Sequence, residues 1–240
     1  MTTKDNLLTA VVLAGGKGTR LRPETDETPK PLMPVGGKAV VEILLLRMQR
    51  TGLKKIHIAV NHMAEKIEST LGDGSKLGLQ ISYSHEKKPL STVGPLKLIK
   101  NLPEHFIVAN ADVITDLNFE KLFKNHLDSK SDLTIASYER QSQADYGILS
   151  VDESGHVVGF NEKPVFNFIV SMGIYVFSKK ILDYVPADTA FGFDSLMYEL
   201  IDKGAAINSY PFDGYWLDIG RHDDYARAND EAEKIKYLLE

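Results

Sequence analysis

A glycine-rich loop that carries fixed cations follows the first apolar segment of the chain. The stretch "VVLAGGKGTRLRPETDETPKPLMPV", residues 11–35, ends an apolar run at two glycines and then presents Arg20, Arg22 and Lys30. Lys30 stands between two prolines, whose rings restrict the backbone on both sides. Glycine lets backbone N–H groups approach a phosphate without a Cβ in the way, and the cations could clamp a triphosphate. The alternative is a solvated basic loop ahead of an ordinary turn, and these residues alone leave both open.

The loop is neither of the two common nucleotide-binding loops. The Walker spacing is absent, and Gly16-Lys17-Gly18 is followed by Thr19 and Arg20 instead of the third glycine of a dinucleotide fingerprint. The chain has no cysteine, and its seven histidines show no metal-ligand spacing. These features disfavour a Walker-type kinase, an NAD enzyme and thiol chemistry. Any catalysis must then use carboxylates, cations and backbone groups.

Length and composition predict one globular domain. The 240 residues are 43% hydrophobic, which is enough to bury a full core. The net charge of −5 gives no basic footprint for a nucleic acid, although a local cationic pocket for a small phosphorylated ligand remains open. The start "MTTKDNLLTA" lacks a signal-peptide core, and no segment has the apolar run that a membrane span needs. We expect a soluble cytoplasmic protein with no nucleic-acid or membrane partner.

Short apolar runs alternate with helix-period segments in the first half of the chain. The expected strands are residues 8–13, 56–60, 79–83 and 106–109, and the expected helices are residues 40–49, 63–71, 95–100 and 118–127. In the last of these helices, Phe119, Leu122, Phe123 and Leu127 share one face. Such alternation predicts a parallel sheet covered by helices, with ligands bound beyond the carboxyl ends of the strands. The glycine loop leaves the first strand at that edge.

Strand follows strand from Asp132 onward. The segments "DLTIASY", "GILSVDESGHVVGFNEK" and "FIVSMGIYVFS" read as strands, and Asp-Glu-Ser-Gly reads as a hairpin turn. A helix at 194–203, a strand at 207–212 and one closing helix follow. The apolar stripe of the closing helix consists of Tyr225, Ala228, Ala232, Ile235 and Leu239. This stripe either docks on its own sheet or makes a homodimer contact.

Ordered motifs along the chain resemble one family. The stretch "LAGGKGTRLRPETDETPKPLMPVGGKAVVE" resembles the signature of the sugar-1-phosphate nucleotidylyltransferases, which runs Leu-Ala-Gly-Gly-x-Gly-Thr-Arg-Leu, Pro-Lys-Pro-Leu and Pro-Val. The segments "EKKPLSTVGPL", "FIVANADVITDLNF", "DYGIL", "NEKP", "GIYVFS" and "YWLDIGRHDDYARAND" resemble it in the same order. The resemblance implies Mg²⁺-assisted in-line attack of a sugar 1-phosphate on a nucleoside triphosphate, with release of pyrophosphate.

The resemblance also implies a fold and a domain plan. The fold would be α/β, with a Rossmann-like mixed, mainly parallel sheet flanked by helices and a smaller antiparallel sugar-binding extension. Residues 1–240 would form a single nucleotidyltransferase domain. About 1–130 would be the nucleotide-binding half, and about 131–240 would be the sugar-binding half with the closing helix. The chain stops at "EKIKYLLE", as short single-domain members do.

Site residues are implied motif by motif. The resemblance makes Arg20, Lys30 and Asp112 catalytic, and it makes Asp112 and Asp218 the magnesium ligands. The implied nucleotide-binding residues are Leu13, Ala14, Gly15, Gly16, Gly18, Thr19, Glu86, Pro89, Thr92 and Asn110. The implied sugar-phosphate-binding residues are Tyr146, Gly147, Glu162, Lys163 and Gly173. Taken singly, each aspartate would read as a cap or turn residue, and Glu162-Lys163 as a surface charge pair.

Neighbouring residues are expected to support the site without entering it. Trp216, next to Asp218, is expected to be a buried anchor for that ligand. His222 and Asp223 are expected to begin the last helix.

Three segments depart from the family pattern and bear on the substrates. Gly-Thr-Ala-Gly becomes Ser91-Thr92-Val93-Gly94, Asn-Gly-Asp becomes Asn110-Ala111-Asp112, and Asn-Ala-Gly becomes Ser171-Met172-Gly173. The lost asparagine removes a hydrogen-bonding group for a sugar hydroxyl, and Met172 adds bulk. GTP with a mannose-, heptose- or amino-sugar 1-phosphate is favoured. The alternatives are a uridylyltransferase acting on an amino-sugar 1-phosphate and a non-catalytic nucleotide-sugar-binding regulatory subunit.

Overall fold

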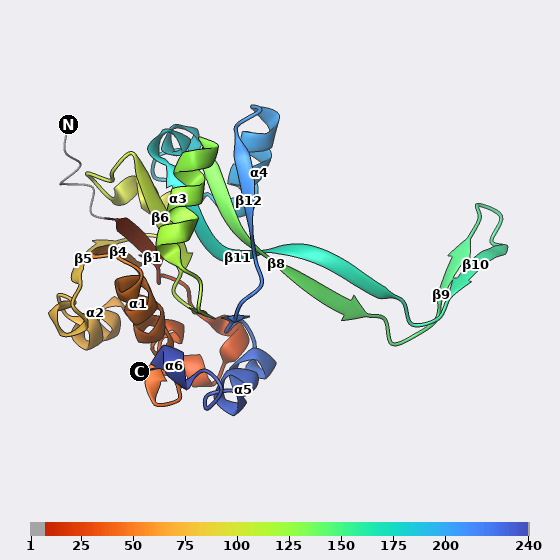
Figure 1. Ribbon diagram of the computed structural model, residues 1–240, viewed down its shortest axis with the longest axis horizontal. Helices are drawn as coiled ribbons and strands as arrows, with labels where there is room; N and C mark the ends of the chain where they lie inside the picture. Colours follow the sequence, from red (N-terminus) through yellow and green to blue (C-terminus); the bar gives the residue numbers. More distant parts are fainter. Residues whose placement is uncertain (1–7, 240) are drawn as a thin grey trace.

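A seven-stranded mixed sheet forms the centre of the molecule (Figure 1). The computed structural model describes residues 8–239, and the strand order is β12-β8-β11-β6-β1-β4-β5. The strands are β1 (Thr9–Leu13), β4 (Lys55–Val60), β5 (Gln80–His85), β6 (His105–Asn110), β8 (Leu133–Gln143), β11 (Val165–Ser178) and β12 (Ile207–Phe212). Strand β11 is antiparallel to β6 and β8, and the other pairs in the sheet are parallel. The predicted α/β fold with a mainly parallel sheet is confirmed.

Both faces of the sheet are covered. Helices α1 (Val40–Arg50), α2 (Ala64–Leu71) and α3 (Phe119–Ser129) bury their apolar faces with Val12 on one side. Helix α4 (Phe193–Asp202) packs with Val11 on the other side. The two valines point to opposite faces because successive strand residues alternate. Within residues 8–239, no helix combines the length and apolar character needed to cross a membrane.

The segment predicted as a helix at 95–100 is only a 3₁₀-helix, Gly94–Leu98. Pro95 fits the first turn, but the chain is already extended at Ile99, so no second turn forms. The turn buries Leu96 beneath the sheet. The helical spacing of apolar residues in this segment therefore corresponds to one buried 3₁₀ turn and not to an α-helix.

Helix α3 begins where the sequence predicts, and three of the four residues expected on one face, Phe119, Leu122 and Phe123, pack in the core. Asn118 caps it by accepting the Lys121 N–H at 2.9 Å. Phe119 is fully buried, whereas Leu127 is 43% exposed. The residue that turns inward in its place is His126, which has no exposed surface. Leu127 therefore lies at the edge of the expected face, and His126 Nδ1 is within hydrogen-bond distance of Thr134 Oγ1, at 2.9 Å.

The predicted single closing helix is two helices, α5 (His222–Asp230) and α6 (Lys236–Leu239). The side chain of Asn229 donates to the Tyr225 carbonyl at 3.0 Å, and α5 ends one residue later. Asn and Asp favour helix ends because their side chains compete for backbone groups. The apolar stripe packs on its own chain, where Ala228, Ile235 and Leu239 join a core with Leu21 and Leu217. As expected, His222 and Asp223 form the start of α5.

The outer parts of β8 and β11 leave the body as a two-stranded ribbon (Figure 1). A second hairpin, β9 (Ile148–Val151) and β10 (Val157–Asn161), lies at its far end. The hairpin turn is the predicted Asp-Glu-Ser-Gly, in which Asp152 accepts the N–H groups of Ser154 and His156, both at 2.9 Å. The antiparallel extension is therefore present, and it projects away from the sheet.

The buried His126 predicts a pH-dependent stability. Burial and the neighbouring His105 ring, 3.0 Å away, lower the pKa of His126 from 6.5 to about 4, against an opposing effect of Asp132. The unfolded chain therefore binds a proton first as the pH falls, so the free energy of unfolding should drop from pH 6.5 toward pH 4. The expected loss from this group is up to about 3 kcal/mol. Urea denaturation across this range measures it.

Substitution isolates the contribution of this one histidine. The variant His126→Gln should show a shallower fall than wild type over the same range, because glutamine does not titrate. The matched control His156→Gln replaces a histidine whose side chain is 80% exposed and should follow the wild-type slope. Equal slopes for wild type and His126→Gln would contradict the assignment.

Candidate active site

A cavity of about 650 Å³ opens at the carboxyl ends of β1 and β6. Residues 13–21, which follow β1, form much of its wall, and Asn110 and Asp112 come from the end of β6. All the residues predicted to be catalytic or nucleotide-binding line it: Leu13, Ala14, Gly15, Gly16, Gly18, Thr19, Arg20, Lys30, Glu86, Pro89, Thr92, Asn110 and Asp112. The structure thus brings together residues that are up to a hundred positions apart, at the sheet edge where parallel strands place ligands.

The glycine loop is shaped by two different constraints. Gly18 has φ 63°, a left-handed conformation, and a Cβ there would lie 3.0 Å from Thr25 Cγ2 and 3.1 Å from Lys30 Cβ. Thr25 also donates its hydroxyl to the Gly18 carbonyl at 2.9 Å. A Cβ on Gly16 would meet nothing within 4 Å. Gly18 is therefore needed to fold the loop onto Lys30, whereas Gly16 leaves open space beside the cavity.

Glu86 and Gly15 meet on the opposite wall of the cavity. A Cβ on Gly15 would lie 2.6 Å from Glu86 Oε1, so glycine is what lets this carboxylate approach the loop. Glu86 Oε2 accepts the Leu90 N–H at 2.8 Å. Burial raises the pKa of Glu86, and the hydrogen bonds from Leu90 and Asn61 oppose that rise. The carboxylate is held in place by backbone and keeps acceptor capacity toward the cavity.

Lys30 and Asp112 form a direct ion pair at the floor of the cavity, Nζ to Oδ2. The lysine lies in a 3₁₀-helix, Lys30–Leu32, with Pro29 at its start and Pro31 inside it. The two side chains are only 13% and 19% exposed, so the pair is largely removed from water. A charge pair held by such a backbone needs little reorganisation when a ligand arrives.

Asp218 is brought beside Asp112 by the pairing of two short strands. Strand β13 (Trp216–Asp218) runs antiparallel to β7 (Val113–Thr115), with Asp218 opposite Val113. The Ile219 N–H donates to the Asp112 carbonyl at 2.9 Å. Burial, and then the charge of Asp112, raise the pKa of Asp218 to about 6, while Lys30 and Arg20 lower it. Asp112 lines the cavity and Asp218 does not, but the two carboxylates are close enough to repel each other.

One oxygen of each carboxylate has no hydrogen-bond partner. Oδ1 of Asp112 and Oδ1 of Asp218 are both buried and unpaired. Buried unpaired carboxylate oxygens are costly unless a cation or water satisfies them. Within residues 8–239 no cluster of three or more His, Cys, Asp or Glu side chains forms a metal cage. A pair of carboxylates with room for water and phosphate oxygens suits Mg²⁺, which keeps several non-protein ligands.

The residues predicted to bind the sugar phosphate are divided by the structure. Gly173 has φ 74°, and a Cβ there would lie 2.6 Å from Asn110 Nδ2, so this glycine packs directly behind the cavity wall. Tyr146, Gly147, Glu162 and Lys163 do not line the cavity. They lie at the far end of the projecting ribbon, next to β9 and β10. The structure therefore assembles the nucleotide side of the predicted site and leaves the sugar side apart from it.

The departures from the family pattern have three different settings. Ser91 lines the cavity with φ 66°, a left-handed conformation that glycine adopts at less cost. Ala111 also lines it and is 2% exposed. Met172 is 1% exposed and packs in the core, so it adds no bulk to the cavity, contrary to expectation. Its carbonyl accepts the Trp216 Nε1–H at 3.0 Å, so Trp216 is the buried anchor that was expected beside Asp218.

Sequence reasoning missed several residues of the cavity wall. Asn61 and His62 line the cavity directly after β4, and Gly220 lines it after β13. The strand-end rule that located the glycine loop applies equally to the residues after β4 and could have found the first two. Gly220 depends on the β7–β13 pairing, for which the sequence carries no local signal.

Comparisons with known proteins agree on one family. The family model described as nucleotidyl transferase matches residues 9–235. UTP–glucose-1-phosphate uridylyltransferase of Synechocystis sp. is 33% identical over 239 residues, covering 91% of this chain and 62% of that protein. Mannose-1-phosphate guanylyltransferase of Mycobacterium tuberculosis is 33% identical over 227 residues, covering 92% of this chain and 63% of that protein. The chain thus spans less than two thirds of the length of these relatives.

A solved structure is similar over nearly its whole length. The crystal structure of HddC from Yersinia pseudotuberculosis complexed with GMP-PN superposes with a TM-score of 0.73 at 28% identity. The match covers 93% of this chain and 99% of the HddC chain.

The glycine loop yields a matched pair of substitutions. Gly18→Ala should lower the free energy of unfolding by at least about 1–2 kcal/mol, because alanine is strained at this φ and its Cβ crowds Thr25 and Lys30. Gly16→Ala should change stability by less than about 0.5 kcal/mol, since its Cβ meets open space. Urea denaturation of the two variants measures the difference. Equal losses would show that the loop is not held as described.

Proposed function

This chain belongs to the nucleotidyl transferase family, and we propose that it transfers a nucleoside monophosphate from a nucleoside triphosphate to a sugar 1-phosphate, releasing pyrophosphate. One observation carries the proposal. The glycine loop and the Lys30–Asp112 pair share one cavity, and an unpaired carboxylate oxygen of Asp112 lies buried there. Such a site combines backbone donors, fixed cations and carboxylates, which are the groups that phosphoryl transfer requires.

The residues act by positioning and by balancing charge. The sugar phosphate oxygen attacks the α-phosphorus in line with the departing pyrophosphate, so no covalent nucleophile is needed. Arg20 and Lys30 line the same cavity and would neutralise the charge that grows on the phosphoryl oxygens. The loop from Gly15 to Gly18 would present backbone N–H groups to the phosphates. These groups are fixed before the substrate binds, so little of the barrier is spent on reorganisation.

We propose Mg²⁺ as the metal, held by Asp112 and Asp218. Their unpaired Oδ1 atoms would supply two of its ligands, and substrate and water oxygens would supply the rest. Bound there, the ion would supply charge neutralisation and alignment for the triphosphate. The protein's own part is to hold the two carboxylates side by side. The raised pKa of Asp218 indicates that they resist being ionised together until a cation arrives.

The base pocket supports GTP over UTP. The ionised Glu86 carboxylate can only accept hydrogen bonds, and the Leu90 N–H that it accepts holds it against Gly15. Guanine presents two adjacent donors, N1–H and N2–H₂, that can pair with the two oxygens of a carboxylate. Uracil presents a single N–H donor flanked by carbonyls that would face Glu86 unfavourably. The Mycobacterium relative, which is named a guanylyltransferase, supports the same choice, whereas the Synechocystis relative is named for UTP.

The substrate choice can be measured with a matrix of nucleoside triphosphates and sugar 1-phosphates. We expect pyrophosphate release with Mg²⁺ to be fastest for GTP with a mannose- or heptose-type sugar 1-phosphate. Glu86→Gln should lower kcat/KM for GTP by about 10- to 100-fold, the value of one or two polar contacts, and raise the preference for UTP. The control is the same variant's release of pyrophosphate with UTP, which should not fall. If the wild type prefers UTP, the assignment of guanine to the base pocket is wrong. If no pair of substrates releases pyrophosphate, the proposed enzymatic activity is wrong.

The catalytic set predicts large losses of turnover. Lys30→Ala or Asp112→Ala should lower kcat by at least about 100-fold, the usual scale for a preorganised electrostatic contact. The matched control is Lys76→Ala, which removes a cation from an exposed surface position and should leave kcat unchanged. Rates within about threefold of wild type for either site variant would place the chemistry elsewhere.

A further inference from the structure

The projecting ribbon is made of strands that have lost their other neighbours. We call residues 139–170 the arm. Strand β12 pairs with β8 only as far as Phe212 opposite Tyr138, and β6 pairs with β11 only from Ile174 onward. Beyond these points β8 and β11 pair with each other alone, from Glu139–Ile169 to Gln143–Val165. The arm therefore has two open edges, which are templates for pairing with another chain.

The arm has no core of its own. None of residues 138–171, all of which the structure describes, is buried. Among the described residues, eleven of the seventeen exposed large hydrophobic side chains belong to the arm. They are Tyr146, Ile148, Leu149, Val151, Val157, Val158, Phe160, Val165, Phe166, Phe168 and Ile169. An isolated two-stranded ribbon with so much apolar surface is not stable in water unless it packs against something.

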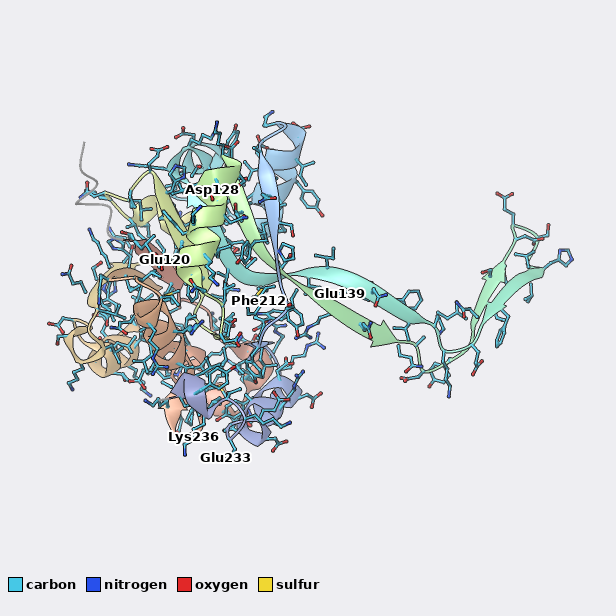
Figure 2. The ribbon with its side chains drawn as sticks, in the orientation of Figure 1. Glu120, Asp128, Glu139, Phe212, Glu233 and Lys236 are labelled. Atoms are coloured by element: carbon cyan, nitrogen blue, oxygen red, sulfur yellow. The ribbon has the colours of Figure 1, made fainter. Side chains whose placement is uncertain are left out.

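The direction of the arm is fixed at its base. The Arg140 guanidinium lies 4.8 Å from the centre of the Trp216 ring, and Tyr138 packs on the same ring at 5.3 Å. Pairing between β8 and β11 stays in register along the arm. Figure 2 shows Glu139 on the part of the ribbon that has already left the body. A turn back onto its own cavity would have to break this regular ladder or the contacts of Arg140.

The arm carries the groups that the cavity lacks. Glu162 and Lys163 lie just before β11, and Lys163 is exposed. Gly173 packs behind the cavity wall. The extended strand from Val165 to Gly173 spans about 25 Å at the rise of a β-strand. Within one chain Lys163 is therefore far from Asp112, which lines the cavity and has Asp218 beside it through the β7–β13 pairing. These two carboxylates and the exposed lysine are opposite in charge.

We infer that two copies of this chain exchange arms, so that the arm of each copy covers the sugar side of the other's cavity and supplies Glu162 and Lys163 to it. A two-fold exchange covers both arms at once and leaves no open edge for further association. The exposed apolar side chains become the interface, and each complete site is made by two chains. The role of Glu162 and Lys163 in this inference rests on the proposed function. The exchange of arms rests on the geometry of the arm alone.

Size measurement tests the exchange without any activity. Light scattering of the full chain should give a dimer. A variant in which Asn-Gly replaces residues 141–167 joins Arg140 to Phe168, which are paired directly, by a two-residue turn. This variant should be a folded monomer by circular dichroism and light scattering. A monomeric full chain, or a dimer that survives removal of the arm, overturns the exchange.

A single charge on the arm provides a gentler test with a matched control. Ile169→Asp places a charge on an arm side chain that is 79% exposed in one chain, and it should weaken dimerisation at least about tenfold. Ile201→Asp alters an α4 side chain that is 63% exposed and should leave dimerisation unchanged. The same shift in both variants, or in neither, counts against the arm as the interface.

Mixed dimers test whether the arm completes the partner's site. A chain with Lys30→Ala keeps a working arm, and a chain with Lys163→Ala keeps a working cavity; each homodimer should lose at least about 100-fold in kcat. A heterodimer isolated with two affinity tags has one site with both parts intact and should recover about half of wild-type activity. The control heterodimer of Lys30→Ala with Asp112→Ala should stay inactive, because both changes lie in the cavity.

The outcomes separate the two proposals. No recovery in the Lys30→Ala and Lys163→Ala heterodimer, with the wild type active, overturns the exchanged site. A wild type that transfers no nucleotide to any sugar phosphate overturns the proposed function, and the light-scattering result then decides the exchange by itself.

Discussion

The structure depends on two carboxylates that are forced together out of water. Asp112 and Asp218 are fixed by the antiparallel pairing of β7 with β13, and the hydrogen bond from Ile219 to the Asp112 carbonyl leaves them little freedom to separate. Like charges this close raise each other's pKa unless cations balance them. Lys30 supplies part of that balance through a direct ion pair, held by a proline on either side. The negative charge that Lys30 does not balance includes the two buried Oδ1 atoms, which have no hydrogen-bond partner.

The rest of the fold serves this arrangement. The loop after β1 can reach Lys30 only because Gly18 accepts a left-handed backbone with Thr25 and Lys30 close against it. The core that includes Leu21 and Leu217 ties this loop to β13 and to the C-terminal helices. The closing helices are therefore structural supports for the carboxylate pair. Their apolar stripe is buried within the same chain. The arm is then the large exposed apolar surface through which two copies can associate.

A feature could be predicted from the sequence when it depends on residues that are close together along the chain. The position of the glycine loop was predictable because it follows the first strand, and ligands bind beyond the carboxyl ends of parallel strands. Glu86, Pro89, Thr92 and Asn110 were placed at the cavity through the family resemblance. Asp218 could be placed only through the family resemblance, since its strand-pairing partner Val113 is 105 positions away. His126 was missed because a helix face was judged by apolar residues alone, while its two ring nitrogens are satisfied by His105 and Thr134.

The arm marks the limit of such reasoning. Successive side chains of a strand point to opposite faces. That holds equally for a ribbon that folds back, projects or pairs with a second copy. The direction is set by contacts at the base, between Arg140 and Trp216, that no local pattern encodes. The two halves of the proposed site are then held by different forces. The nucleotide half is built into one chain's core, so its affinity does not depend on protein concentration. The sugar half exists only while two chains remain associated, so turnover is linked by mass action to the dimer equilibrium.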